Sequence, residues 1–140
     1  MTSINLTCAF RFDVNNSTYI GQNVPTLYSA LTVGGNYSSN PLVYGQVNPY
    51  VVKHNDVVEI VVNNQNNNLH PWHLHGHQFQ VLERTLPNTG SFPGTYSDYS
   101  RTPVQRDTIM LQPHAYAVIR FRANNPDKSP SPLPFSPRKN

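Results

Sequence analysis

Val57-Val58-Glu59-Ile60-Val61-Val62 carries the strongest structural signal in this sequence. Five of its six residues are β-branched, and such residues favour strands over helices. The run does not alternate between apolar and polar residues, as a strand with one face in water would. It therefore predicts a strand in the interior of a β-sandwich, preceded by a turn at Lys53–Asp56 and followed by a polar connector at Asn63–Asn68.

Shorter β signals lie on both sides of this run. One helical turn is expected within Asn23–Leu31, and Pro87–Pro103 has the Gly and Ser content of a long loop. Several short strands separated by turns predict an all-β fold, an antiparallel sandwich. The expected strands are Ala9–Val14, Tyr19–Ile20, Pro49–Val52, Gln78–Leu82, Asp107–Leu111 and Ala115–Phe121, with turns at Asn15–Ser17 and Gln112–Pro113.

The composition is that of one domain with few charges. The chain has 140 residues, of which 12% are charged, and a formal net charge of +3 with a pI near 9.2. Its basic side chains are scattered and form no stripe that could follow a nucleic acid. No apolar run approaches the roughly 20 residues of a membrane span, and Met1–Phe12 lacks the core of a signal peptide. We therefore expect no nucleic-acid binding, no membrane segment and no signal peptide in this chain.

The cysteine content and the glycosylation sequons indicate whether the parent protein is secreted. Cys8 is the single cysteine, so an intrachain disulfide cannot form. Four Asn-x-Ser/Thr sequons lie in the first forty residues, and their grouping favours descent from a secreted glycoprotein. These sequons begin at Asn5, Asn15, Asn16 and Asn36.

Four of the six histidines fall within His70-Pro71-Trp72-His73-Leu74-His75-Gly76-His77. Imidazole is the commonest side-chain metal ligand near neutral pH. In an extended segment, side chains two positions apart share a face, so His73, His75 and His77 would point one way and His70 another. The octet therefore predicts one metal centre at His73 and His75 and a different one at His70.

Histidines also occur as isolated surface groups and in other metal motifs. A lone histidine is more often a surface group than a ligand, and this is our expectation for His54 and His114. Motifs of other metalloproteins fit the octet poorly. Glu83 lies too far along for a cupin, His77 and Gln78 replace the Asp and His of metallo-hydrolases, and the zincin His-Glu-x-x-His is absent.

The octet resembles the His-Pro-x-His-Leu-His-Gly-His signature of the last cupredoxin domain of multicopper oxidases, which include laccases, ascorbate oxidases and fungal ferroxidases. The resemblance implies a cupredoxin-like antiparallel Greek-key β-sandwich over residues 10–126, after an N-terminal extension at 1–9. The Pro- and Ser-rich tail at 127–140 has the composition of a disordered segment. Further similar stretches are Asn23–Leu27, Val57–Gln65, Gln78–Leu82, Arg106–Thr108 and Arg120–Pro126.

The resemblance also implies copper as the cofactor and a role for each histidine. His70 would bind the type 1 copper, His73 the type 2 copper, and His75 one of the type 3 pair. His77 matches a position that is not normally a ligand. Members of the family take single electrons from a phenol or Fe(II) and reduce dioxygen to water.

The sequence departs from the family pattern after Pro126. There the family continues with a His-Cys-His strand, whereas Asp127-Lys128-Ser129 follows here, and Cys8 matches no family ligand. We therefore expect a domain that is incomplete at its C-terminal end, a truncated product that is not catalytic alone. The alternatives are a stand-alone metal-binding module and an inert fragment without redox turnover.

A second departure concerns the reducing substrate. Related ferroxidases often carry an aspartate four residues before the first histidine of the octet, and Asn66 stands there. Asp98 in the long loop is the alternative acidic residue, although an aspartate in a loop is usually only solvated. Phenol and Fe(II) both remain open as reductants. The resemblance implies that the parent protein is secreted or lies at the cell surface.

Overall fold

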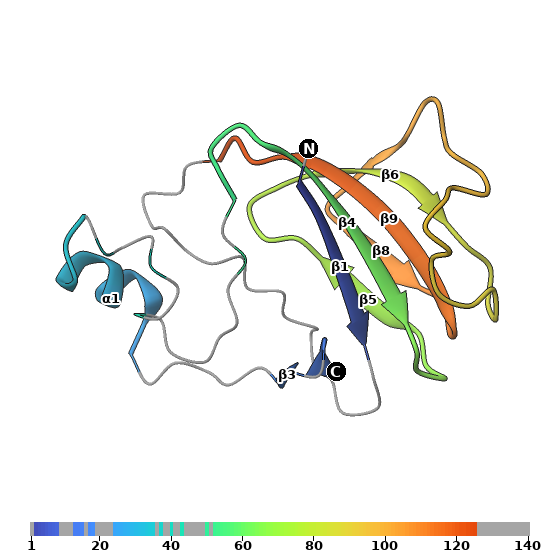
Figure 1. Cartoon of the computed structure of the whole chain (residues 1–140), viewed down its shortest axis with the longest axis horizontal. Coiled ribbons are helices and arrows are strands. Elements are labelled where there is room, and N and C mark those ends of the chain that lie inside the picture. The colour runs from blue at the N-terminus through green and yellow to red at the C-terminus, as the bar shows by residue number, and fades with distance from the viewer. Residues whose placement is uncertain are drawn as a thin grey trace.

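The computed structural model describes residues 2–8, 13–15, 17–18, 24–35, 37, 40, 43, 50 and 52–125, which form two packed β-sheets and one short helix. The larger sheet has seven strands in the order β3-β2-β1-β4-β9-β6-β7, and the smaller sheet pairs β5 with β8 (Figure 1). The elements are β1 (Thr2–Cys8), β2 (Asp13–Val14), β3 (Ser17–Thr18), α1 (Thr26–Thr32), β4 (Val57–Asn64), β5 (His70–His73), β6 (Phe79–Arg84), β7 (Gln105–Arg106), β8 (Thr108–Leu111) and β9 (Ala115–Arg122).

β4 lies at the centre of the larger sheet, and seven of its eight residues are buried. It pairs with β1 on one side and β9 on the other, so both edges of its backbone are hydrogen-bonded. Val58, Ile60 and Val62 belong to the main core, whereas Val61 packs in a second cluster on the opposite face. The prediction that this run lies in the sandwich interior is confirmed.

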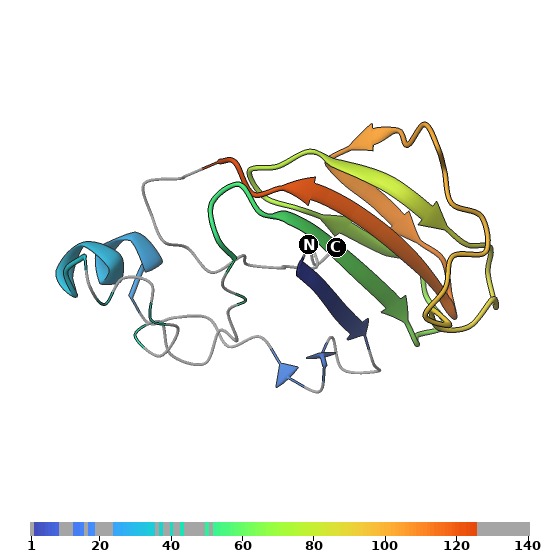
Figure 2. The same ribbon diagram turned by 45° about the horizontal axis from the view of Figure 1, so that its top comes forward.

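The main core fills the space between the two sheets, and Figure 2 shows the smaller sheet behind the larger one. Trp72 and Leu74 enter this core from the octet, and Ile109 and Leu111 enter it from β8. Burial of such apolar side chains is the main favourable term in folding. Trp72 and Leu74 therefore anchor His73, which lies between them.

The loop after β6 covers the outer face of the larger sheet. Phe92 and Tyr96 pack on a cluster that includes Leu82 and Tyr116. The backbone N–H of Phe92 also donates to Oδ1 of Asn63 at 2.8 Å. The loop predicted at Pro87–Pro103 is thus confirmed, and these contacts tie it to the sheet.

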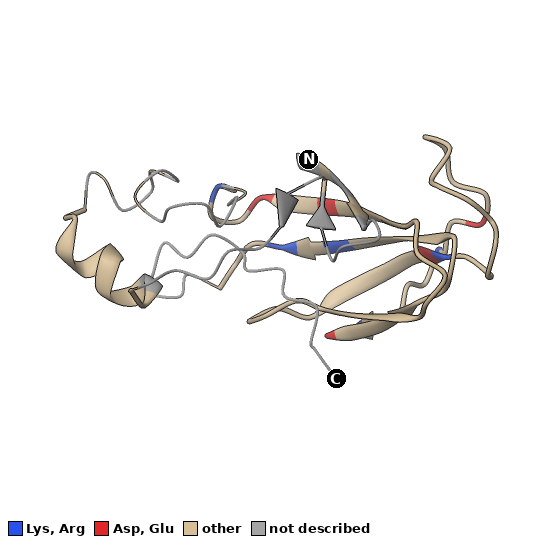
Figure 3. Ribbon diagram, turned by 90° about the horizontal axis from the view of Figure 1, so that it is seen from below, with Lys and Arg blue, Asp and Glu red and all other residues tan. Residues whose placement is uncertain are grey.

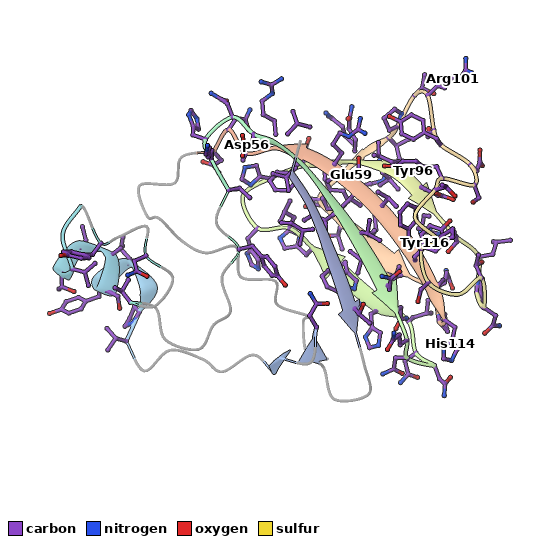
Figure 4. All side chains as sticks on the ribbon, viewed as in Figure 1. Asp56, Glu59, Tyr96, Arg101, His114 and Tyr116 are labelled. Carbon is purple, nitrogen blue, oxygen red and sulfur yellow. The ribbon has the colours of Figure 1, made fainter. Side chains whose placement is uncertain are left out.

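A partly buried ion pair holds one end of this loop. Glu59 on β4 lies opposite Arg120 on β9, and Nη2 of Arg120 donates to Oε2 of Glu59 at 2.9 Å. Figure 3 shows the acidic and basic residues as short red and blue bands scattered along the ribbon. The Tyr96 hydroxyl donates to the other oxygen of Glu59, beside which it lies in Figure 4. Burial, together with this hydrogen bond, raises the pKa of Tyr96 to about 12. Both carboxylate oxygens of Glu59, the one polar residue of Val57–Val62, therefore have partners.

β1 differs from the expectation for the N-terminus. Thr2–Cys8 was assigned to an extension before the first strand, but the structure pairs it with β4. Ile4 is 6% exposed and belongs to the main core. The alternation of Ile4 and Leu6 with polar neighbours is a strand pattern. The β1–β4 pair is parallel, and the other described strand pairs are antiparallel.

Of the remaining expectations, one is confirmed, one is wrong, and the others fall outside the described residues. The helical turn expected within Asn23–Leu31 is confirmed by α1, which stands apart from the sheets in Figure 1. Tyr50 and Val52 are not in a strand, contrary to the prediction for Pro49–Val52. Residues 9–12, 19–20 and 126–140 lie outside the described residues, so the domain bounds at 10 and 126 and the disordered tail stay predictions. In the described part of the chain, no helix is long and apolar enough to cross a membrane.

Candidate metal centre

The histidine octet begins as a strand and ends in a turn. β5 pairs with β8 as far as His73, and the backbone N–H of Leu74 then donates to the Asp107 carbonyl at 3.2 Å. Gly76 turns the chain with a φ of 74°, a left-handed conformation that glycine adopts without strain. Nδ2 of Asn125 donates to the Gly76 carbonyl at 2.9 Å and stabilises this turn. The expectation of an extended octet therefore holds only for its first half, because the chain turns after His75.

His73 and His75 lie side by side. Their ring centroids are 4.8 Å apart, and the ring planes are inclined by 72°. His73 is half-buried, whereas His75 is exposed. Two neighbouring imidazoles, one of them open to solvent, are suited to bind one transition metal ion or two adjacent ones. Two of the three predicted ligands are thus brought together.

The hydrogen bonds of His73 indicate which ring nitrogen is free for a metal. Nδ1 lies 2.8 Å from the carbonyl oxygen of Asp107 and 3.0 Å from Oγ1 of Thr108. A carbonyl oxygen can only accept, so the proton is assigned to Nδ1. Nε2 of the neutral ring then carries the lone pair. Such a partner on the second nitrogen is typical of metal-binding histidines.

His70 occupies the first position of β5, opposite the fully buried Leu111. Burial lowers the pKa of its imidazole below the ordinary value. The ring is therefore neutral at pH 7, as a ligand must be. Among the residues that the structure describes, no three His, Cys, Asp or Glu side chains are placed to hold one metal ion. His70 is accordingly not gathered with His73 and His75 into one site.

His77 is separated from this pair. Its ring packs edge-on against Phe121 of β9, with a centroid distance of 4.9 Å and an interplanar angle of 60°. Both ring nitrogens are buried without a hydrogen-bond partner. The expectation that His77 shares a face with His73 and His75 is wrong, because the turn at Gly76 directs it toward the core.

An asparagine-rich connector leads into the octet and is fastened to the turn between β8 and β9. Nδ2 of Asn64 donates to the carbonyls of Asn68 and Gln112, at 2.9 Å each. Oδ1 of Asn66 accepts from the backbone N–H of Asn68 at 3.1 Å. His114 is half-buried and its Nε2 contacts Oδ1 of Asn67, so it is not a free surface histidine. The position of β5 is therefore stabilised on the side from which the chain enters.

Sequence reasoning missed the residues that orient His73. Arg106-Asp107-Thr108 resembles the family in sequence, but the sequence alone predicts no role for it. The contact of Asp107 and Thr108 with His73 depends on the pairing of β5 with β8 across more than thirty residues. A motif of a few consecutive residues cannot reveal how β5 aligns with β8.

Comparison with known proteins identifies this arrangement. A sequence model of the family "Multicopper oxidase" matches residues 19–128. The iron transport multicopper oxidase fetC of Epichloe festucae is 40% identical over 116 residues, which cover 79% of this chain and 18% of the relative. The iron transport multicopper oxidase FET5 of Saccharomyces cerevisiae is 38% identical over 131 residues, covering 80% and 21%. The chain spans about a fifth of the length of these curated relatives.

Solved structures confirm the fold. The crystal structure of Fet3p, a multicopper oxidase that functions in iron import, superposes with a TM-score of 0.79 and 33% identity, covering 89% of this chain and 26% of that one. A laccase from B. aclada matches with a TM-score of 0.56 and 21% identity, which bears on the fold alone. The expected cupredoxin-like antiparallel β-sandwich is therefore confirmed.

Proposed function

This chain belongs to the multicopper oxidase family, as a domain related to fungal ferroxidases, and we propose that it binds copper through His70, His73 and His75. The observation that carries the proposal is the pair of imidazoles at His73 and His75. Their rings are neighbours, and Nδ1 of His73 donates to the Asp107 carbonyl and lies within hydrogen-bond distance of the Thr108 hydroxyl. Imidazole donors of this kind suit copper by their chemistry.

The proposed roles follow the family motif residue by residue. His73 would bind a type 2 copper and His75 a type 3 copper, while His70 would bind a type 1 copper. The neighbouring rings of His73 and His75 support adjacent centres in one cluster. The position of His70, at the start of β5 and outside that pair, supports a separate centre. Copper, when bound, would supply one-electron redox chemistry at both.

The chain's own residues prepare these ligands. The Asp107 carbonyl and the Thr108 hydroxyl hold the His73 proton on Nδ1, so that the lone pair of Nε2 would be available to a metal. Trp72 and Leu74 are 8% and 3% exposed and fix the backbone on either side of His73. A ligand side chain that is already held in place loses less conformational entropy when a metal binds.

Turnover would require ligands from outside the described histidines. The segment after Pro126 contains neither histidine nor cysteine, and no three-ligand group exists in the described chain. We propose that the domain is not catalytic alone and that a partner segment completes the sites for dioxygen reduction. A metal-binding module without turnover is the second candidate, favoured by the exposed ring of His75.

The reductant of the completed oxidase would be Fe(II) or a phenol. The names of the fungal relatives favour Fe(II). Asn66 favours a phenol, because its side chain is neutral and its Oδ1 accepts from the backbone of Asn68 instead of facing a cation freely. A parent protein that is secreted or at the cell surface fits the sequons, of which Asn15 lies in an exposed turn.

Calorimetric titration of the metal-free chain with Cu(II) tests the proposal. Replacing both His73 and His75 by alanine should weaken the tightest Cu(II) binding by more than about tenfold. His54→Ala is the matched control, because His54 is an exposed histidine outside the octet. Unchanged affinity in the double variant would show that copper binds elsewhere. Oxygen uptake with a phenol or Fe(II) separates an oxidase from a module that only holds metal.

A further inference from the structure

The helix α1 carries an apolar patch on the side that faces solvent. Leu27, Tyr28 and Leu31 are 53%, 64% and 72% exposed. Residues three and four positions apart are neighbours on the surface of a helix, so Leu31 lies beside both Tyr28 and Leu27. The three side chains therefore form one continuous patch, which we call the α1 stripe.

The opposite side of α1 carries smaller residues that are more buried. Ala30 is buried, and Ser29 and Val33 are half-buried. With about 3.6 residues per turn, these positions lie on the side of the helix away from the α1 stripe. A surface helix ordinarily turns its apolar side toward the core of its own domain. The large apolar side chains of α1 do the reverse, which orients them for a contact outside this chain.

α1 has little support of its own. It extends over only Thr26–Thr32, and Pro25 at its N-cap makes no side-chain hydrogen bond. Its first turn has no acidic residue and its last turn no basic residue. Helices this short are marginal unless an apolar face is packed, and Figures 1 and 2 show α1 apart from both sheets. Packing of the α1 stripe against a partner would supply this missing support.

The sequence around α1 specifies the chemistry of that partner. Residues 14–52 contain no Asp, Glu, Lys, Arg or His. Helices that lie on membranes use Lys and Arg on their polar face to attract lipid headgroups, and α1 has neither. A charged protein surface would likewise find no opposite charge here. The surface that fits the α1 stripe is therefore apolar and uncharged.

The size of the stripe indicates where the partner lies. A helix of this length measures about 10 Å, whereas a stable interface between separate chains buries roughly 1,200–2,000 Å². Two α1 stripes packed on each other would bury far less, so a second copy of this chain is not a stable occupant. A small contact is sufficient within one polypeptide, because the tether raises the effective concentration to about the millimolar range.

Relatives of this chain carry the corresponding helix within a much longer polypeptide. The multicopper oxidase family model matches residues 19–128, which include α1, and the chain spans about a fifth of fetC and FET5. We propose that the α1 stripe docks into an uncharged apolar groove on the part of the oxidase polypeptide that this chain does not span. Amphipathic helices bind such grooves through anchors three and four residues apart. The inference rests on family membership and not on copper binding.

A double variant of the metal-free, 140-residue chain provides the first test. Leu27→Lys together with Leu31→Lys places charge on the α1 stripe, and lysine has nearly the helix propensity of leucine. The urea midpoint should stay unchanged, as in the matched control Leu86→Lys, since Leu86 is 79% exposed outside α1. A lower midpoint in the double variant alone would show that the stripe packs within this chain and would overturn the proposal.

The second test supplies the partner. The 140-residue chain is joined through a Gly/Ser linker to FET5 of Saccharomyces cerevisiae from which the matching stretch has been removed. Hydrogen exchange of the α1 amides should be at least about tenfold slower than in the free chain, since burying two leucines is worth about 3 kcal/mol or more. The double variant should return to within about twofold of the free chain, whereas Leu86→Lys should keep the protection.

The state of the partner is checked in the same sample. A cooperative thermal transition shows that the FET5 part is folded, and the corresponding part of Epichloe festucae fetC replaces it where that transition is missing. Equal α1 exchange in the free chain and in the folded fusion would refute the docking. Protection should also be the same at about 0.05 and 0.5 M NaCl, because the groove is uncharged. A strong salt dependence would contradict that chemistry.

Other occupants of the α1 stripe give different results. A dimer of the free chain in sedimentation equilibrium that the double variant abolishes would assign the stripe to a second copy. Slower α1 exchange of the free chain on phosphatidylserine vesicles would assign it to a membrane. Either result would overturn the proposal. All samples contain EDTA, so the outcome is separate from the copper titration at His73 and His75.

Discussion

Thr108 lies directly opposite His73 in the β5–β8 pair, and its Oγ1 is 3.0 Å from Nδ1 of the imidazole. The neighbouring Asp107 carbonyl lies 2.8 Å from the same nitrogen. One strand therefore carries the candidate ligand, and the start of the partner strand orients it. The orientation of His73 depends on this strand pairing as much as on the octet itself.

Removing the Thr108 hydroxyl should weaken metal binding without removing a ligand. Thr108→Val keeps the shape of the side chain and the Asp107 carbonyl, so we expect Cu(II) affinity to fall by about tenfold, the lower end for such partners. Calorimetric titration measures the effect. Thr102→Val, at an exposed loop position, should leave the affinity unchanged. Equal Cu(II) affinities in the wild type and the two variants would show that the Thr108 hydroxyl does not support metal binding.

The core beneath the octet should dominate stability. Leu111 is fully buried opposite His70, and Leu111→Ala should lower the free energy of unfolding by about 2–5 kcal/mol. Leu86 is 79% exposed, and the same replacement there should change it by less than about 0.5 kcal/mol. Urea unfolding followed by Trp72 fluorescence gives both values. Similar effects at the two leucines would contradict the packing described.

Tyr96 should hold the loop after β6 against the larger sheet. Tyr96→Phe removes the donor to Glu59, so local opening should become about fivefold more frequent, equivalent to ~1 kcal/mol. Trypsin cleavage after Arg101, in the same loop (Figure 4), reports this opening. Tyr28→Phe, at an exposed position on α1, should leave the cleavage rate unaltered. A slower or unchanged rate in Tyr96→Phe would contradict the anchoring role.

Acid should weaken the attachment of this loop through Glu83, a buried residue of β6 whose Oε1 accepts from the Ser97 hydroxyl and the backbone N–H of Asp98. Burial raises the pKa of Glu83, but hydrogen bonds from Ser97, Tyr116 and Asp98 outweigh burial and hold the pKa below its ordinary value of 4.5. The stabilisation by the ionised form is therefore fully present above that value and is lost as the pH falls through the folded pKa. The free energy of unfolding of the wild type should drop more steeply than that of Glu83→Gln between about pH 6 and pH 3. Parallel pH profiles would show that Glu83 does not contribute.

Local patterns predicted the central strands well. The β-branched run of β4 and the segment Ala115–Phe121 became buried neighbours in the larger sheet, because their composition fits no other environment. The turn at Gln112–Pro113 was also predicted, although the structure adds a left-handed His114 with a φ of 45°. Composition and turn chemistry act over a few residues, and these features depend on little else.

Contacts between distant segments could not be predicted in this way. The parallel pairing of β1 with β4 joins residues more than fifty positions apart, and its short sequence was read as an extension. The octet shows the same limit, because alternation was applied through Gly76, where the backbone turns and separates His77 from His75. The copper ligands themselves remain a prediction from the motif, supported by the neighbouring rings of His73 and His75.

Pulsed electron paramagnetic resonance of the Cu(II)-loaded chain tests the central claim most directly. The remote nitrogen of a bound imidazole gives a distinct modulation, and we predict imidazole coordination of copper in the wild type. His73→Ala and His75→Ala should each weaken this modulation, whereas His54→Ala should leave the spectrum unchanged. A modulation that stays at full strength when His73 and His75 are replaced together would contradict copper binding at this pair.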